Sequence, residues 1–378
     1  MDDQAKIALL QKVIQFNTVN GNEQPLAGYL KEVLAQHHID SQLVKFADKR
    51  TCLVAEIGDQ PGKVLAFAGH MDTVATGDPA KWQYPPFSGK IVNGNIYGRG
   101  SVDMKGGLTA MVISLIQMKE AGLPKHGKVR LLLSVDEEVG GQGSMLLTQK
   151  GYADDLDAMV MGEASSNQLE YAHCGSFDYK IESFGKTAHS SRPDLGINAV
   201  ANLARFIDGE RTAFADAQPS PVLGKVIHSV TVFHGGEQLN SIPDYAYLKG
   251  NVRTVPECDN KETQARLQKI IDQLNKQGAQ LRLKVVASFA PVVTDPHDPF
   301  INLVSDAVAA TKGSKPKVIV SHGATDASRY SLAERPFSFV EYGPGDDRQS
   351  HQINEHLLVD DFLQAPTIYQ QIAEKFLI

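Results

Sequence analysis

This 378-residue sequence has few cysteines, one tryptophan and no long apolar run. Its three cysteines, Cys52, Cys174 and Cys258, are scattered and odd in number, which excludes a disulfide framework and a zinc site of paired cysteines. No apolar stretch approaches the roughly 20 residues that span a bilayer. Residues 1–16 lack the basic and apolar segments of a signal peptide, so we expect a cytoplasmic protein.

Basic residues are also in deficit. The chain has 37 Lys and Arg against 44 Asp and Glu, a formal net charge of −7, and no Lys/Arg run. This balance argues against an extended nucleic-acid surface, and no feature suggests a membrane partner. The length exceeds one typical domain, so we expect two.

An apolar run at 65–69 ends in His70 and, two residues later, Asp72. Such a run is typical of a central parallel strand, and open α/β sheets bind their ligands at the carboxyl ends of strands. If one ring nitrogen of His70 bound a metal, the other would need an acceptor, which a nearby carboxylate often supplies. On its own, the motif is more typical of a hydrogen-bonded pair than of a metal site.

Two further predicted strands, at 129–135 and 157–162, are also followed by acids. The first runs into Glu137 and Glu138, and the second ends in Glu163. A solvated loop is the simpler explanation for the first pair alone. Because parallel strands end at the same edge of a sheet, we expect these acids to lie near His70.

A glycine-rich loop at 97–107 opens a predicted helix that runs to about Glu120 and places Asp103 near its start. The loop is neither G-x-G-x-x-G nor a Walker motif, which argues against a dinucleotide or phosphate site. Asp103 could be a helix N-cap or a metal ligand. One histidine with several carboxylates and no cysteine fits a two-metal hydrolytic site better than a structural zinc site.

A second histidine is expected from the C-terminal part of the chain. A predicted strand at 336–341 runs into a Gly-Pro-Gly turn and then to His351. His356 is a competing candidate. We rank it lower because it falls where the last helix is expected to start.

The middle of the chain has a different pattern. Residues 176–288 have the order β-α-β-β-α-β, which is ferredoxin-like. The expected strands are 177–184, 226–234, 244–255 and 281–290, with helices at 198–207 and 261–277. We therefore predict an α/β catalytic domain of 1–175 and 289–378 with a mostly parallel sheet, interrupted by an inserted ferredoxin-like α+β domain of 176–288.

Eight sequence blocks together resemble one known family over nearly the whole chain. They are GHMDTV at 69–74, YGRGSVDMKGG at 97–107, DEEVGG at 136–141, GEAS at 162–165, GKTAHSS at 185–191, GGEQLNSIPD at 235–244, NVRTVPE at 251–257 and GPGDDRQSHQINE at 343–355. The family is that of the di-zinc amidohydrolases and peptidases, which includes acetylornithine deacetylase, succinyl-diaminopimelate desuccinylase, aminoacylase-1 and carboxypeptidase G2.

The resemblance implies a role for each acid and histidine of the predicted site. His70 and Glu163 would bind one Zn²⁺, Glu138 and His351 would bind the other, and Asp103 would bridge both. Asp72 would orient His70. Glu137 would act as the general base. Co²⁺ is a possible substitute for zinc.

The resemblance implies that the inserted domain is a dimerisation (lid) domain. It also implies that His189 reaches the site of a partner subunit in a homodimer and stabilises the oxyanion. Asn240 and Arg253 resemble substrate-binding residues. The loop with Gly323 and Thr325 resembles the one that binds a substrate carboxylate. Simpler roles are a surface histidine for His189 and an exposed sheet residue for Arg253. Many family members have Arg two residues after the Asp of this loop. Here Ser328 stands there, which leaves the role of Arg329 open.

The implied reaction is metal-dependent hydrolysis of an N-acyl amide bond on a small amino-acid substrate. The chain looks closest to the succinyl-diaminopimelate desuccinylases of lysine and diaminopimelate biosynthesis, and desuccinylases have Glu where acetylornithine-type members often have Asp, as at Glu163. Alternatives are N-acetylornithine deacetylase, a metallo-dipeptidase or an aminoacylase. A binding protein without catalysis would not need Glu137, which this chain retains.

Overall fold

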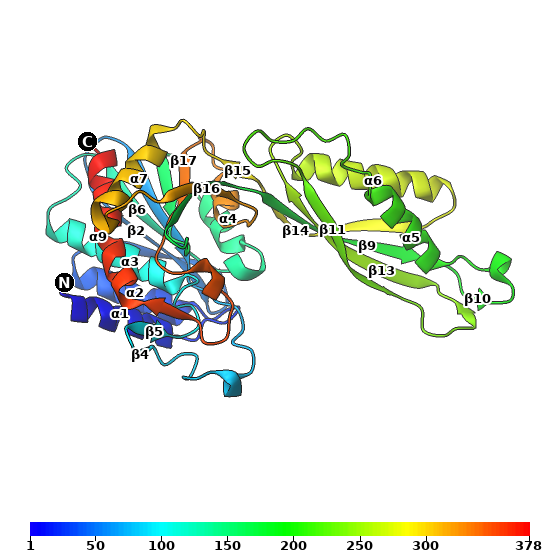
Figure 1. The fold of residues 1–378 in the computed structure, drawn as a ribbon, viewed down its shortest axis with the longest axis horizontal. Coiled ribbons are helices and arrows are strands. Elements are labelled where there is room, and N and C mark those ends of the chain that lie inside the picture. The colour runs from blue at the N-terminus through cyan, green and yellow to red at the C-terminus, as the bar shows by residue number, and fades with distance from the viewer. The chain divides into compact units, whose positions relative to one another are not determined.

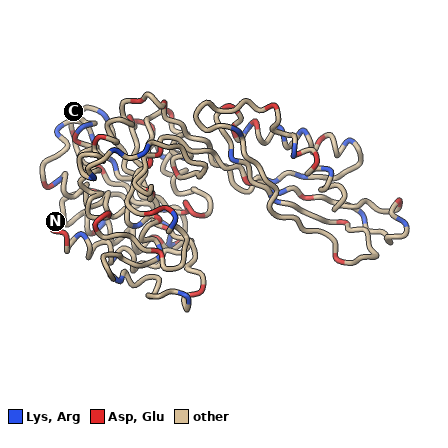
Figure 2. The backbone as a smooth tube through the Cα atoms, viewed as in Figure 1, with Lys and Arg blue, Asp and Glu red and all other residues tan.

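The computed structural model describes all 378 residues and divides the chain into two compact units (Figure 1). Unit 1 contains Met1–Ala172, Thr294–Val320 and Thr325–Ile378, and unit 2 contains His173–Val293 and Ser321–Ala324. The expected α/β fold with a mostly parallel central sheet and an inserted α+β segment is confirmed. Figure 2 shows basic and acidic residues interspersed along the backbone of each unit.

The central sheet of unit 1 has the strand order β1-β2-β6-β3-β7-β17-β8. The bounds of these strands are β1 Ser41–Ala47, β2 Arg50–Ile57, β3 Val64–His70, β6 Lys128–Ser134, β7 Ala158–Met161, β8 Gln168–His173 and β17 Ser338–Glu341. Strands β6, β3, β7 and β17 run parallel to one another, whereas β2 and β8 pair antiparallel with the two outer strands of this group. Every residue of β3 is buried, as expected for a strand with both faces covered.

Helices cover this sheet, with α3 packed on β3 and β6 and α2 on β1 and β2. The helices of unit 1 are α1 Asp3–Gln15, α2 Gln24–Gln36, α3 Lys105–Glu120, α4 Gln142–Gln149, α7 Pro299–Lys312, α8 Ala327–Tyr330 and α9 Val359–Phe376. At the start of α3, a Cβ on Gly107 would lie 1.9 Å from the carbonyl oxygen of Gly162. Glycine therefore lets α3 approach the end of β7 closely.

A small sheet of unit 1 corrects one prediction. His356 begins strand β18, His356–Leu358, and does not lie in the last helix, which starts at Val359. β18 pairs with β5, Asn95–Tyr97, which pairs with β4, Lys90–Val92. The His356 ring stacks on Tyr97, and its Nδ1 lies 2.8 Å from the carbonyl oxygen of Asn354.

Unit 2 is a four-stranded antiparallel sheet in the order β11-β13-β9-β14. Its strands are β9 Gly175–Phe184, β11 Ile227–Gly235, β13 Tyr245–Thr254 and β14 Leu281–Phe289, with helices α5 Ala199–Glu210 and α6 Asn260–Lys276. Two short strands, β10 Ala188–His189 and β12 Ser241–Ile242, pair separately. The order β-α-β-β-α-β matches the expected ferredoxin-like pattern.

The remaining short elements are the strands β15 Val292–Val293 and β16 Lys317–Ser321 and the 3₁₀ turns η1 Pro79–Lys81, η2 Glu137–Val139, η3 Pro193–Leu195 and η4 Asp347–Gln349. None of the helices combines the length and the apolar character needed to cross a bilayer.

Candidate active site

Three parallel strands of unit 1 bring the predicted site residues to one edge of the sheet. In the strand register, His70 at the end of β3 is paired with Ser134 at the end of β6, and Ala68 is paired with Met161 at the end of β7. Glu138 follows β6 and Glu163 follows β7, so both acids start from the edge where His70 lies.

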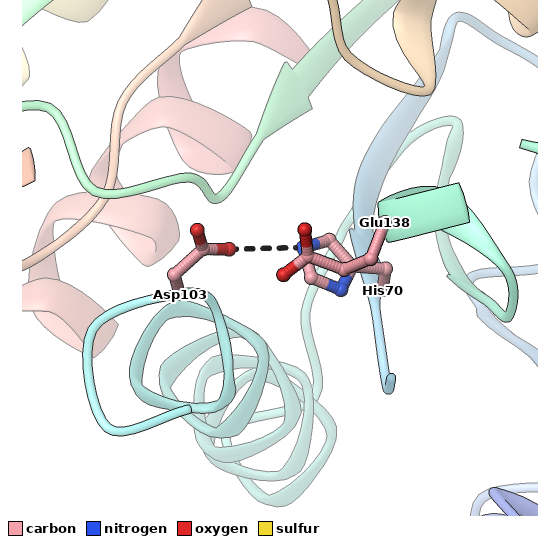
Figure 3. A group of neighbouring side chains, drawn as sticks. All are labelled: His70, Asp103 and Glu138. Carbon is pink, nitrogen blue, oxygen red and sulfur yellow. Dashed lines mark hydrogen bonds and ion pairs between the residues drawn. The ribbon is translucent and has the colours of Figure 1, made fainter. Parts of the chain in front are cut away.

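Asp103 lies between two histidines that are 281 positions apart in the sequence. Its Oδ1 is 3.1 Å from Nε2 of His70, and its Oδ2 is 3.2 Å from Nε2 of His351. Figure 3 shows Asp103 and Glu138 approaching His70 from separate elements. Asp103 precedes α3 and makes no side-chain cap, because Met104 occupies the N-cap position.

Each histidine has one further carboxylate. Oε1 of Glu163 is 3.4 Å from Nε2 of His70, and Oε2 of Glu138 is 3.1 Å from Nε2 of His351. The five side chains therefore form two sets of one histidine and one glutamate, and Asp103 is shared by both. Ligand atoms of His70, Asp103 and Glu138 all lie within 4.8 Å of one another.

The charged groups of this cluster are those expected at a cation-binding site. Burial lowers the pKa of His70, but Glu163 and Asp103 outweigh it and raise that pKa well above its usual range. Hydrogen bonds to Asp103 and Glu138 raise the pKa of His351 to about 10. Burial raises the pKa of Glu163 strongly. Without bound cations, the raised pKa values favour the protonated forms of these side chains. Two divalent cations in place of the protons suit the oxygen and imidazole donors of the cluster.

The two acids after β6 face different groups. Oε1 and Oε2 of Glu138 lie 3.3 Å and 3.1 Å from Nε2 of His351. Burial raises the pKa of Glu137 well above its usual range, with Asp326 and Glu163 adding to the effect against the charge of His70. A carboxyl group with a raised pKa beside a metal-type cluster is suited to accepting and returning a proton.

Asp72 uses its backbone and its side chain for different purposes. Its carbonyl oxygen lies 3.0 Å from Nδ1 of His70, whereas its carboxylate lies 3.6 Å from the same nitrogen. The carboxylate accepts the backbone N–H groups of Glu137 at 3.3 Å and Glu138 at 3.2 Å. Asp72 therefore anchors the acid-bearing turn η2 as well as contacting the His70 ring.

Asp136, at the start of this turn, has φ of 73° in the left-handed region. Arg50 donates to Asp136 at 2.6 Å and to the fully buried Glu23. Nη2 of Arg329 donates to the carbonyl oxygen of Gly140 at 2.7 Å. Arg329, whose role the sequence left open, is thus a buried support for the turn that carries Glu137 and Glu138.

Two acids near the site had no role in the sequence analysis. Glu341 ends β17 and is buried, and burial beside Glu170 and Glu137 raises its pKa well above its usual range. Asp326 is buried, accepts from Ser144 at 2.5 Å and from Ser134, and burial raises its pKa to about 6. Glu341 could have been identified from the sequence as a candidate, because the strand expected at 336–341 ends at this residue.

In unit 2, two of the candidate residues lie together and the third lies apart. His189 is exposed in β10 and pairs with Ser241 of β12, and the N–H of Ser190 donates to the carbonyl oxygen of Asn240 at 3.0 Å. Arg253 is paired with Ser176 near the C-terminal end of β13. Nearly the length of β13 separates Arg253 from the β10–β12 pair.

The two candidates of the Gly323–Thr325 loop fall in different units. Gly323 is exposed in unit 2, and its N–H donates to Oγ of Ser321 at 3.0 Å. Thr325 is half-buried in unit 1, where its Oγ1 accepts from the N–H of Ala327 at 3.3 Å. His322, which directly precedes this loop, is exposed.

Comparison with known proteins places this geometry in a family. The model of peptidase family M20/M25/M40 matches residues 66–375. A Staphylococcus epidermidis protein named "Probable succinyl-diaminopimelate desuccinylase" is 35% identical, with 100% of this chain and 99% of the relative covered. A succinyl-diaminopimelate desuccinylase of Methylorubrum populi is 28% identical over 100% of this chain and 99% of that protein.

Solved structures agree on the fold. An M20 family metallo-carboxypeptidase from Sulfolobus solfataricus superimposes with a TM-score of 0.83 at 19% identity, covering 100% of this chain and 99% of the other. The Bacillus subtilis YXEP protein, a dinuclear metal binding peptidase of the M20 family, gives 0.75 at 18% identity, with 99% and 98% covered. The chain therefore belongs to peptidase family M20/M25/M40 and is a hydrolase.

Proposed function

We propose that this hydrolase cleaves the N-acyl amide bond of an N-acylated amino acid, with N-succinyl-L,L-diaminopimelate as the substrate and succinate and L,L-diaminopimelate as products. The observation that carries the hydrolytic mechanism is Asp103, whose two oxygens contact His70 and His351 separately. The 35% identity to a full-length relative with the desuccinylase name supports this choice of substrate.

The two sets of side chains are the proposed ligands of two Zn²⁺ ions, for which Co²⁺ is a substitute. His70 and Glu163 would hold one ion, Glu138 and His351 would hold the other, and Asp103 would contribute a ligand to both. When bound, such ions polarise the substrate carbonyl and lower the pKa of an attacking water. The negative charge of Asp103 and the two glutamates reduces the repulsion between two dications at short range.

Glu137 is the proposed general base. It takes a proton from the attacking water as the new C–O bond forms, and it returns that proton to the amide nitrogen as the C–N bond breaks. The raised pKa of its carboxyl group suits both steps, because the group can hold the proton between them. Asp72 keeps Glu137 in place through the backbone N–H of that residue.

Unit 2, together with Thr325 of unit 1, supplies the other proposed contributions. His189 stabilises the oxyanion in the site of a partner subunit, which requires a homodimer formed through this unit. Asn240, Arg253, Gly323 and Thr325 bind the substrate, and the planar guanidinium of Arg253 suits a carboxylate. A cytoplasmic location completes the proposal.

The test is steady-state hydrolysis of N-succinyl-L,L-diaminopimelate and N-acetyl-L-ornithine by zinc-loaded protein, with a chelator-treated sample as control. We expect kcat/KM to be at least about a hundredfold higher for the succinyl compound, because a site that pairs the extra carboxylate loses that contact with the acetyl compound. Preference for the acetyl compound would overturn the substrate and leave the mechanism. Activity that survives complete metal removal would overturn the mechanism.

A further inference from the structure

Two of the proposed metal ligands lie in turns and do not directly follow a strand of the central sheet. His70 ends β3 and Glu163 follows β7, so the sheet register sets their positions. Asp103 lies in turns before α3, and His351 lies in turns between η4 and β18, with its side chain 52% exposed. Another interaction must hold the two segments in place, so that Oδ2 of Asp103 lies 3.2 Å from Nε2 of His351.

Glu355 connects the two segments from one side. Its side chain is fully buried, and Oε1 accepts the backbone N–H groups of Val102 at 2.8 Å and Asp103 at 3.1 Å. Oε2 accepts the N–H of Gly100 at 3.1 Å. One carboxylate of the His351 segment thus fixes the backbone of the Asp103 segment through three hydrogen bonds.

Arg99 connects the same segments from the other side. Its guanidinium, 2% exposed, donates to Oε2 of Glu355 at 2.6 Å. It also donates to the carbonyl oxygens of His351 at 3.3 Å and Gln352 at 3.2 Å, and to that of Ala75 at 3.1 Å. Arg99 therefore fixes the backbone of the His351 segment to the segments that follow β5 and β3.

Because both charges are buried, each group of this pair depends on its present hydrogen-bond partners. A buried carboxylate needs several donors, and a buried guanidinium needs several acceptors, because each loses its hydration. Each group here pairs with the other and makes further hydrogen bonds, most of them to the backbone of the two ligand segments. Removal of one partner leaves the other charge buried and unpaired, so the segments would rearrange to solvate it.

We propose that the buried Arg99–Glu355 pair is a positioning device that sets the distance between Asp103 and His351 and so the affinity of the metal centre. This inference rests on the proposed function for the identity of the ligands. The pair makes its hydrogen bonds to backbone atoms of the ligand segments and not to the ligand side chains. It acts by keeping the two loop-borne ligands preorganised, as the sheet register does for His70 and Glu163.

The experiment compares wild-type protein with Glu355→Gln, which keeps the size of the side chain and removes its charge. Zinc binding is measured by competition with a chromophoric chelator. We expect the weaker of the two bound ions to lose about 10–100-fold in affinity, the range typical of residues that support metal ligands. Arg99→Lys is the second variant, because an ammonium keeps the charge but cannot span three carbonyls and a carboxylate.

Glu56→Gln is the matched control. Glu56 accepts from the buried Arg130 at 2.6 Å and 2.9 Å, an ion pair between β2 and β6 away from the ligand segments. Both substitutions break a charge pair with a buried arginine, but only Glu355→Gln should weaken zinc binding. If both variants lose stability and both keep wild-type zinc affinity, the positioning proposal is overturned.

Amide hydrogen exchange of the metal-free protein gives a readout that does not depend on metal. We expect Val102 and Asp103 to exchange faster in Glu355→Gln than in wild type or Glu56→Gln. Unchanged exchange at these amides would overturn the proposal. Wild-type protein that binds fewer than two ions would instead overturn the proposed function, and the exchange comparison would still decide the role of the Arg99–Glu355 pair.

Discussion

The two units organise their candidate residues in different ways. In unit 1, parallel strands end side by side and deliver His70, Glu138 and Glu163 to one edge of the sheet. In unit 2, antiparallel strands carry His189 and Arg253 to positions almost a full strand apart. The parallel sheet of unit 1 therefore brings its candidate residues together, whereas the antiparallel sheet of unit 2 keeps its candidate residues apart.

The difference shows which functional claims rest on structure within one unit. The cluster of unit 1 has mutual distances, burial and pKa shifts that support a hydrolytic centre. His189 is exposed, and its Nδ1 lies 2.8 Å from Oγ of Ser191, so nothing within unit 2 gives it a catalytic partner. Its proposed role depends on a second subunit.

Glu137→Gln is expected to have the largest effect. The substitution removes the group that carries the proton and leaves the five proposed ligands in place. We expect kcat to fall by about 10²–10⁴-fold, the usual contribution of a general base. Zinc content, measured by elemental analysis, should remain at the wild-type value. A variant that keeps near-normal kcat would remove Glu137 from this role.

His189→Ala tests whether unit 2 completes the site of a partner subunit. We expect a loss of about 10²–10³-fold in kcat, the range for one oxyanion donor. Mixing this variant with Glu137→Gln under conditions of subunit exchange should restore activity. Random exchange in a two-fold dimer gives wild-type residues at roughly one quarter of all sites. No recovery after verified exchange would argue that His189 acts within its own subunit or not at all.

Arg253→Lys tests the proposed carboxylate contact at the other end of β13. Lysine keeps the charge and loses the bidentate geometry. We expect KM to rise about tenfold, a loss of about 1.4 kcal/mol in binding, with kcat nearly unchanged. Arg282→Lys, at an exposed position of β14, is the matched control and should leave KM unaltered. Equal effects of the two substitutions would exclude a specific contact.

His173→Gln is expected to have the smallest effect, on the acid stability of unit 2. Burial lowers the pKa of His173 to about 4. In the unfolded chain, the imidazole of His173 binds a proton below about pH 6.5. In the folded chain, it binds that proton only below about pH 4. Stability falls as the pH falls through this window, by up to about 1.4 kcal/mol per pH unit.

Urea unfolding at intervals between pH 7 and pH 4.5 measures that slope. The variant should have a shallower slope than wild type, and His322→Gln, at an exposed position, should not. Parallel slopes for wild type and His173→Gln would show that His173 does not contribute to acid unfolding.

Much of the fold could be predicted because its signals are local. The apolar runs of β3 and β6, the glycine-rich entry to α3 and the alternating strands of unit 2 each lie within a few residues. His356 was misplaced because its strand has three residues and exists only through pairing with β5, more than 250 positions earlier. Short strands that depend on distant partners leave little local pattern.

The site divides in the same way. Residues at strand ends could be identified from chain position and chemistry, and Glu341 could have been added by the same rule. Arg99, Glu355 and Arg329 could not, because each acts through backbone atoms that are remote in sequence. The two contacts of Asp72 could not be predicted either. Its carbonyl oxygen lies near His70 and its carboxylate binds η2, and the sequence does not say which group of one residue makes which contact.

The wide spacing of the ligands also has a consequence for biosynthesis. Unit 2 is almost one continuous segment and can fold soon after it emerges from the ribosome. The proposed metal centre is completed later, because β17, His351 and Glu355 follow the main segment of unit 2 in the chain, and a nascent chain ending before His351 has only four of the five proposed ligands. Binding of the second proposed ion therefore has to follow the synthesis of His351, and the segment that carries His351 and Glu355 decides when the proposed site is complete.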